Sequence, residues 1–204
     1  MSRRKPVHLE MKGTKDNRQR IWEALRAERR PFTAQHIAWV VDLDLETTRY
    51  CLQGLRRAGY IEQTGEKATR GKEQLLHLVK DCGVEAPAIT RMGKPSTTGL
   101  GTEAMWRSLR ILGEVSADEL AAQASVSAKT TQKTAYGYLL WLHRAGYVIE
   151  VAPATTGPKG RKARYRLAPG KYTGPRAPMI QGIGQLYDPN LAEVVYSQHE
   201  GAQA

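Results

Sequence analysis

Apolar residues in the first third of the chain recur at helical spacing and then give way to two short apolar runs. Ile21, Trp22 and Leu25 lie on one face of a predicted helix that begins at Asp16 or Asn17 and ends near residue 29. The elements predicted after it are a helix capped by Thr33, a helix over 45–58 capped by Asp44, and strands over 60–63 and 74–79. This order predicts a small domain of three helices closed by a β-hairpin.

The same order of elements is predicted again further along the chain. Ser116 and Glu119 have the spacing of a capping box, in which a hydroxyl and a carboxylate satisfy each other's backbone donors. We expect Ser127 to cap the third helix of this second unit. The other predicted elements are a first helix that ends at Gly113 and strands over 148–151 and 163–167.

A seven-residue motif ends the third helix of both predicted units. Leu55-Arg56-Arg57-Ala58-Gly59-Tyr60-Ile61 returns as Leu142-His143-Arg144-Ala145-Gly146-Tyr147-Val148. The glycine suits the left-handed residue that follows a helix, and the apolar pair after it suits a strand. The pairs Thr47-Thr48 and Thr130-Thr131 also correspond, at 83 residues apart, whereas the two Ala-Gly-Tyr motifs are 87 residues apart. We therefore expect the third helix of the second unit to be about one turn longer.

Composition divides the rest of the chain around these two units. Residues 1–15 are basic and poor in apolar groups, which predicts a flexible arm. Prolines and glycines without periodicity predict a linker over 83–100, and residues 169–204 have the composition of an extended tail. The expected fold class is mainly α with small β wings (α+β), with tandem domains over 16–82 and 101–168.

The positive charge is concentrated in two blocks rather than spread along the chain. The formal net charge is +11 over 204 residues. Residues 1–30 hold 10 Lys and Arg against 4 Asp and Glu, and residues 151–187 hold 7 against none. Residues 31–150 are almost neutral, with 14 against 13, and the last stretch is acidic. Two basic blocks beside compact domains favour a polyanionic partner.

Several function classes are disfavoured by what the sequence lacks. No apolar run is long enough to cross a bilayer, and the basic N-terminus has no apolar stretch behind it, so we expect a cytoplasmic protein without membrane contact. Cys51 and Cys82 are expected to be reduced. The five histidines show no metal-ligand spacing, and no grouping resembles a catalytic site or a phosphate-binding loop. We expect no enzyme activity, no metal and no cofactor.

The segment over 120–131 has the residue pattern of a bacterial helix-turn-helix. Ala122 is the small residue in the middle of the first helix, Val126 is the apolar residue of the turn, and Ser127 and Thr130 take the cap and helix positions. With the hairpin that follows, residues 102–168 resemble a winged helix-turn-helix domain of bacterial or phage type.

Residues 16–80 resemble a more diverged copy of the same domain. This copy departs from the family pattern at Trp39, where a small residue is usual, and in its turn, which carries Asp42 and Asp44. Together the two copies cover about two thirds of the chain.

The resemblance implies where DNA contacts should lie. In such domains the outward residues at the start of the third helix enter the major groove, while a basic wing or arm contacts phosphates. Arg164 and Arg166 alternate along a strand and so share a face. The expected DNA-binding residues are Lys129, Thr130, Gln132 and Lys133 in the second helix-turn-helix, Lys159, Arg161, Lys162, Arg164 and Arg166 in its wing, Thr47, Arg49 and Gln53 in the first copy, and Arg3, Arg4 and Lys5 in the arm.

The leading functional hypothesis is double-stranded DNA binding that controls transcription, which would associate the protein with the nucleoid. Origin binding or another accessory role in phage or plasmid replication is an alternative of the same class. A different alternative is a protein-interaction adaptor that binds its partner through the first domain or the tail. RNA binding is a further alternative. The chain is expected to act as a monomer or a homodimer.

Overall fold

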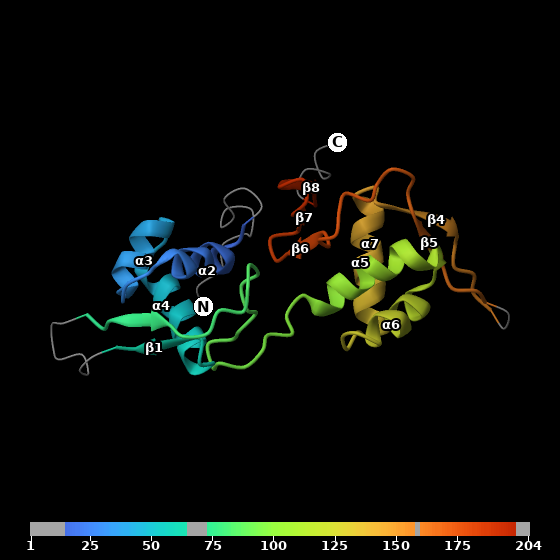
Figure 1. Cartoon of the computed structure of the whole chain (residues 1–204). Coiled ribbons are helices and arrows are strands. Elements are labelled where there is room, and N and C mark those ends of the chain that lie inside the picture. Colours follow the sequence, from blue (N-terminus) through green and yellow to red (C-terminus); the bar gives the residue numbers. More distant parts are fainter. Residues whose placement is uncertain (1–14, 65–72, 158–159, 199–204) are drawn as a thin grey trace. The chain divides into compact units, whose positions relative to one another are not determined.

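The structure is a computed structural model that describes residues 15–64, 73–157 and 160–198. The described residues form an α+β fold with six helices and small antiparallel sheets. They divide into two compact units, one over residues 15–96 and one that begins at Thr97 (Figure 1). We refer to them as the N-terminal unit and the C-terminal unit and describe each by itself.

The N-terminal unit contains three helices and a two-stranded hairpin. Its side-chain caps are those that the sequence predicts, because Asp16, Thr33 and Asp44 each accept a backbone N–H at the start of a helix. The first helix ends two residues earlier than expected. The elements are α2 (Asn17–Ala27), α3 (Ala34–Val41), α4 (Leu45–Arg57), β1 (Ile61–Gln63) and β2 (Leu76–Leu78).

The C-terminal unit repeats this order and adds a short strand between its first two helices. That strand lies beside β5, so the sheet has the order β3-β5-β4. The predicted capping box of Ser116 and Glu119 is confirmed, since both of its hydrogen bonds are present. The elements are α5 (Leu100–Leu112), β3 (Glu114–Val115), α6 (Ala117–Ser125), α7 (Gln132–Arg144), β4 (Val148–Ala152) and β5 (Arg164–Leu167).

The expected start of the third helix in this unit is wrong. The residue that caps α7 is Thr131, whose hydroxyl accepts the backbone N–H of Thr134, and Ser127 lies in the preceding turn. Both α4 and α7 contain 13 residues, so α7 is not one turn longer. The additional residues lengthen α6 and the turn before α7. Thr131 therefore corresponds to Asp44, and the expected match between the two Thr-Thr pairs is wrong as well.

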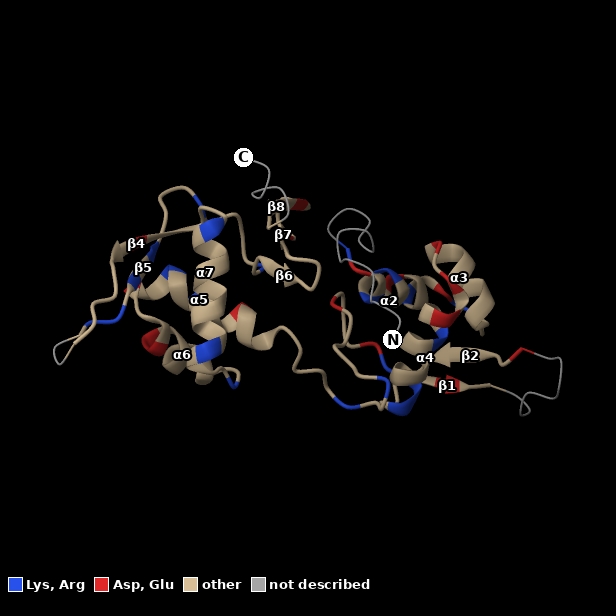
Figure 2. Ribbon diagram, turned by 180° about the vertical axis from the view of Figure 1, so that it is seen from behind, with Lys and Arg blue, Asp and Glu red and all other residues tan. Residues whose placement is uncertain are grey.

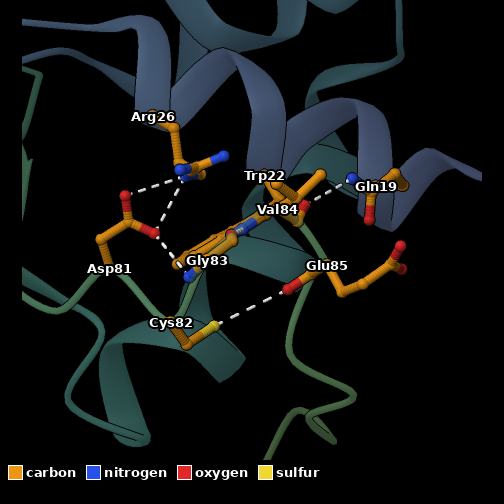
Figure 3. A network of polar contacts seen from close by, with 8 residues as sticks. All are labelled: Gln19, Trp22, Arg26, Asp81, Cys82, Gly83, Val84 and Glu85. Atoms are coloured by element: carbon orange, nitrogen blue, oxygen red, sulfur yellow. Dashed lines mark hydrogen bonds and ion pairs between the residues drawn. The ribbon is translucent and has the colours of Figure 1, made fainter.

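Most of the segment that was expected to be a linker packs on the N-terminal unit. The indole N–H of Trp22 donates to the carbonyl of Gly83 (2.8 Å), and Gln19 donates to the carbonyl of Val84 (Figure 3). The side-chain oxygen of Gln19 also accepts the N–H of Ala86. Residues 88–96 then form a narrow hairpin, with a bridge between Ile89 and Pro95. These hydrogen bonds to α2 explain why the Pro and Gly residues here do not form a flexible connection.

The expected extended tail is also folded and belongs to the C-terminal unit. It forms a three-stranded antiparallel sheet of β6 (Met179–Gln181), β7 (Gln185–Asp188) and β8 (Glu193–Ser197). Leu186 of β7 and Ala177 join the same buried core as Trp106 and Tyr147. The apolar residues of this segment were too few to suggest a helix, but they are enough to complete a core that the first three helices leave open.

The two segments that follow the hairpins correspond to each other. Gly83-Val84-Glu85-Ala86-Pro87-Ala88-Ile89 matches Gly174-Pro175-Arg176-Ala177-Pro178-Met179-Ile180, and each is followed by a hairpin with a left-handed glycine, Gly93 or Gly184. We call residues 83–96 and 174–188 the return segments. Each segment returns to the first helix of its own unit. There the indole N–H of Trp106 donates to the carbonyl of Gly174, just as the indole N–H of Trp22 donates to the carbonyl of Gly83.

Candidate nucleic-acid interface

The turn before α7 holds two of the expected DNA-binding residues outside the helix. Thr130 is tied into the turn, because its hydroxyl donates to the carbonyl of Ala128 (2.8 Å) and its N–H donates to Ser125 Oγ (3.3 Å). It is half-buried, so its role here is to shape the turn rather than to present a hydroxyl to solvent. Lys129 beside it is exposed, as is Val126.

The first turn of α7 presents Gln132 and Lys133 to solvent. Both side chains are exposed, and no acidic residue lies in this first turn. The free N–H groups of a helix start carry a partial positive charge, which adds to the charge of Lys133. Figure 2 shows Lys and Arg at both ends of α7 and along β5. Lys129 and Lys133 form no ion pair with another residue of the described ranges.

The basic residues of the C-terminal wing are paired with acids of their own unit. Lys162 forms an ion pair with Asp118, and Arg164 binds Glu119 (3.1 Å) and the carbonyl of Glu114 (3.0 Å). Arg166 lies 4.0 Å from the carboxylate of Glu114. Residues 159–166 contain no acid, so this stretch of sequence gives no sign of the acids that β3 and α6 bring alongside.

The hydrogen bonds and ion pair around Glu119 lower the pKa of its carboxyl group. The backbone N–H of Ser116 and then the guanidinium of Arg164 lower the pKa of Glu119, so this carboxylate stays ionised below its ordinary range. The wing is therefore closer to neutral than its sequence suggests. Among the wing residues that the structure describes, Arg161 is exposed and forms no ion pair with another described residue. Its backbone N–H donates to Thr155 Oγ1 (2.9 Å).

Four expected contacts lie outside the described residues. They are Lys159 in the wing and Arg3, Arg4 and Lys5 in the arm.

Of the three candidates of the N-terminal unit, Arg49 and Gln53 have side chains that are engaged within the unit, and Thr47 is engaged through its backbone. Arg49 pairs with Glu46 (3.1 Å), and the backbone N–H of Thr47 donates to the capping carboxylate of Asp44. Gln53 accepts a hydrogen bond from Arg91 Nε (2.6 Å). The start of α4 is thus acidic, unlike the start of α7.

Two basic residues of the expected linker belong to a hairpin that packs on α4. Arg91 and Lys94 belong to the hairpin of the return segment, and Arg91 contacts Gln53 and Tyr50. The signal that could have found them is the recurrence of Gly-x-x-Ala-Pro-x-Ile after each predicted hairpin.

Comparison with known proteins adds no assignment: no family model matches this chain, and no curated protein matches it. Within the described ranges, no three His, Cys, Asp or Glu side chains gather as a metal ion would require. None of the helices in those ranges combines the length and apolar character of a membrane span.

Proposed function

We propose that the chain binds double-stranded DNA, that each unit is a winged helix-turn-helix domain, and that the protein regulates transcription. Three helices followed by an antiparallel hairpin, in the same order in both units, support this proposal. Replication-origin binding is the alternative within the same class, and its DNA contacts would be the same.

The observation that carries the proposal is the exposed, uncompensated positive charge at the start of α7. Lys129 and Lys133 lie on either side of the helix cap, and Gln132 between them offers an amide that can read a base edge. A helix that starts in this way fits the major groove at its N-terminal end. The paired cations of the wing would have to break internal ion pairs before they could contact a phosphate.

The first experiment is selection of bound duplexes from a random DNA pool at about 150 mM salt, because non-specific binding weakens there. Enrichment of one motif would establish specific recognition. Two half-sites about one helical turn apart would mean that both units read DNA. Absence of any bound duplex at low and moderate salt would refute the proposal.

A pair of matched variants then tests which cations make the contact. Lys129→Ala/Lys133→Ala and Lys162→Ala/Arg166→Ala each remove two positive charges from the C-terminal unit. We expect the first variant to bind DNA at least tenfold more weakly, and the second to change affinity by a smaller factor because its cations are internally paired. Gln132→Ala should instead broaden the selected motif. The opposite ranking of the two double variants would place the interface on the wing.

A protein-binding role for the N-terminal unit is the second candidate function. Trp39 on α3 is 79% exposed and Val40 beside it is 45% exposed, which is unusual for a large aromatic residue. The acidic turn after them disfavours DNA at this corner. If the partner is a second copy of the chain, sedimentation equilibrium should detect a dimer that Trp39→Ala dissociates without loss of DNA affinity. A monomer at all concentrations would exclude that partner.

A further inference from the structure

The hairpin of the first return segment brings two cations to the C-terminal half of α4. Arg57 is the last residue of α4, and its guanidinium donates to the carbonyl of Arg91 (3.0 Å). Arg91 crosses to α4 in turn, where it donates to Gln53. Lys94 follows on the same hairpin and is exposed. We call Tyr50, Arg57, Arg91 and Lys94 the α4–hairpin patch.

Close backbone packing fixes the position of this patch. A Cβ atom on Gly54 would lie 2.7 Å from the carbonyl oxygen of Thr90, and one on Gly93 would lie 2.7 Å from the Cβ of Arg57. The two glycines therefore let the hairpin lie directly on the helix. The cations at its tip are held against α4 by these contacts and by the hydrogen bonds of Arg57 and Arg91.

The patch has no internal counter-charge. Arg57, Arg91 and Lys94 form no ion pair with any residue in the described part of the chain, unlike Arg26 and Arg49 of the same unit. Their contacts are with neutral acceptors: a carbonyl, an amide and the sulfur of Met92. Two arginines joined by a hydrogen bond, with an exposed lysine on the same hairpin and no ion-paired acid among the described residues, make a site for an anion.

An exposed aromatic ring lies within the patch. Tyr50 is 57% exposed, and the guanidinium of Arg91 lies 5.5 Å from its ring centroid. A cation beside an exposed ring is common in surfaces that follow a nucleic-acid backbone, because the cation meets phosphate while the ring meets sugar or base.

We infer that the α4–hairpin patch binds the phosphodiester backbone of a nucleic acid. This inference rests on the proposed function and adds a second contact, in the unit whose helix start is acidic. The N-terminal unit would then contact DNA through the C-terminal half of α4 and the return segment, not through Thr47 and Arg49.

The test compares two variants of the full chain that lose the same charge from the same unit. Arg91→Ala/Lys94→Ala removes two cations of the patch. Arg29→Ala/Arg30→Ala removes two exposed cations that follow α2 and form no ion pair with a described residue. The measurement is the affinity for a duplex of about 20 base pairs between about 50 and 200 mM salt, at which each lost phosphate contact lowers the salt slope by about 0.9.

We expect the patch variant to reduce the slope of log affinity against log salt by about 1.8. Over this fourfold range of salt, the affinity of the patch variant would then fall by a factor about 12 times smaller than that of the parent. The control variant should keep the parent slope. An unchanged slope in the patch variant, with a parent that binds duplex, would overturn this inference and leave the proposed function intact. A parent that binds no nucleic acid would overturn both. A single-stranded oligonucleotide of the same length distinguishes the source of the backbone, because Tyr50→Ala should weaken binding to the single strand more than to the duplex if bases stack there.

Discussion

Two tryptophans show how a single residue organises each unit. Trp22 and Trp106 are both buried, and each ring packs edge-on against the tyrosine of the Ala-Gly-Tyr motif, Tyr60 or Tyr147, with centroids 5.8 Å apart. Each indole N–H then donates to the carbonyl of a glycine that lies more than sixty residues later. One side chain thus joins the first helix, the hairpin and the return segment of its unit.

The two cysteines should differ sharply in reactivity. Burial raises the pKa of the Cys51 thiol to about 11, whereas Cys82 is exposed just before the return segment. Since the thiolate is the reactive form, an aromatic disulfide reagent at pH 8 should modify one thiol per native chain rapidly and the second only on unfolding. Cys82→Ser should abolish the rapid phase. A rapid phase that survives in this variant would contradict the burial of Cys51.

The C-terminal unit should lose stability at alkaline pH. Burial raises the pKa of Tyr138, Tyr147, Tyr165 and Tyr187, and the hydrogen bond from Tyr147 to Asp188 (2.5 Å) contributes to the shift of Tyr147. The folded unit therefore keeps protons that the unfolded chain releases near pH 10, so the free energy of unfolding falls as pH rises above that value.

Urea unfolding midpoints at pH 8 and pH 10.5 measure this effect. The midpoint should be lower at the higher pH, and Tyr147→Phe should reduce the difference between the two conditions because it removes one of the titrating groups. Equal midpoints at the two pH values would contradict the prediction.

At the scale of the elements, the sequence predicted helices and hairpins well and the segments after them poorly. Caps such as Asp44 and Ser116 are local hydrogen bonds, so a short pattern is enough to find them. The return segments depend on contacts between residues far apart in sequence, from 34 positions for Arg57 and Arg91 to 68 for Trp106 and Gly174. Their prolines and glycines suggested a linker and a tail, because an irregular segment that packs on a helix has no hydrophobic periodicity by which to recognise it.

The candidate site was predicted only in part, for a related reason. Gln132 and Lys133 are exposed on the predicted third helix, but they lie in its first turn because the helix begins four residues later than the sequence suggested. The ion pairs of Lys162, Arg164 and Arg166 could not be predicted, because their partners are up to 52 residues away in sequence and meet the wing only in the folded unit.

Substitution by alanine should have opposite effects on the free energy of unfolding at two glycines, Gly54 in α4 and Gly137 in the equivalent helix α7. Gly54 in α4 lies under the backbone of Thr90, and a Cβ there would be too close to the carbonyl oxygen, at 2.7 Å. Gly137 in α7 has nothing within 4 Å of such a Cβ. We expect Gly54→Ala to lower the free energy of unfolding by about 1–3 kcal/mol through overpacking, despite the better helix propensity of Ala. Gly137→Ala should raise it by about 0.5–1 kcal/mol.

Chemical denaturation of the full chain, followed by circular dichroism, gives both values. Stabilisation by Gly54→Ala would show that the hairpin does not pack on α4 as described. The position that corresponds to Gly54 in α7 is Trp141, and there the helix and the hairpin of the second return segment border an open cavity of about 710 Å³. The return segment thus lies directly on the helix where this position is Gly54 and borders a cavity where it is Trp141.

On the scale of the whole molecule, each unit has a core that its return segment completes. Ala177 and Leu186 belong to the core of the C-terminal unit, and Ala86 packs against that of the N-terminal unit. A fragment of residues 97–168 would leave the indole of Trp106 and the hydroxyl of Tyr147 without their partners. Unsatisfied polar groups and exposed apolar surface both oppose folding.

Fragments therefore test where the units end. Residues 15–96 and 97–198 should each unfold cooperatively on heating, as followed by near-ultraviolet circular dichroism. Residues 97–168 should show no cooperative transition, and residues 15–82 should melt at a lower temperature than 15–96. Cooperative folding of 97–168 with the stability of 97–198 would refute the assignment of the return segment to the core.

The match between the return segments has a consequence for the history of the chain. Corresponding residues are 84 positions apart at the two buried tryptophans, 87 apart at the tyrosines and 91 apart at the first glycines of the return segments. The separation grows mainly in connections, where insertions are tolerated. A head-to-tail duplication of one ancestral gene segment that already encoded the return segment accounts for this pattern. Such a duplication would give both copies every part of the fold, so that each could diverge, one towards an acidic helix start and the other towards a basic one.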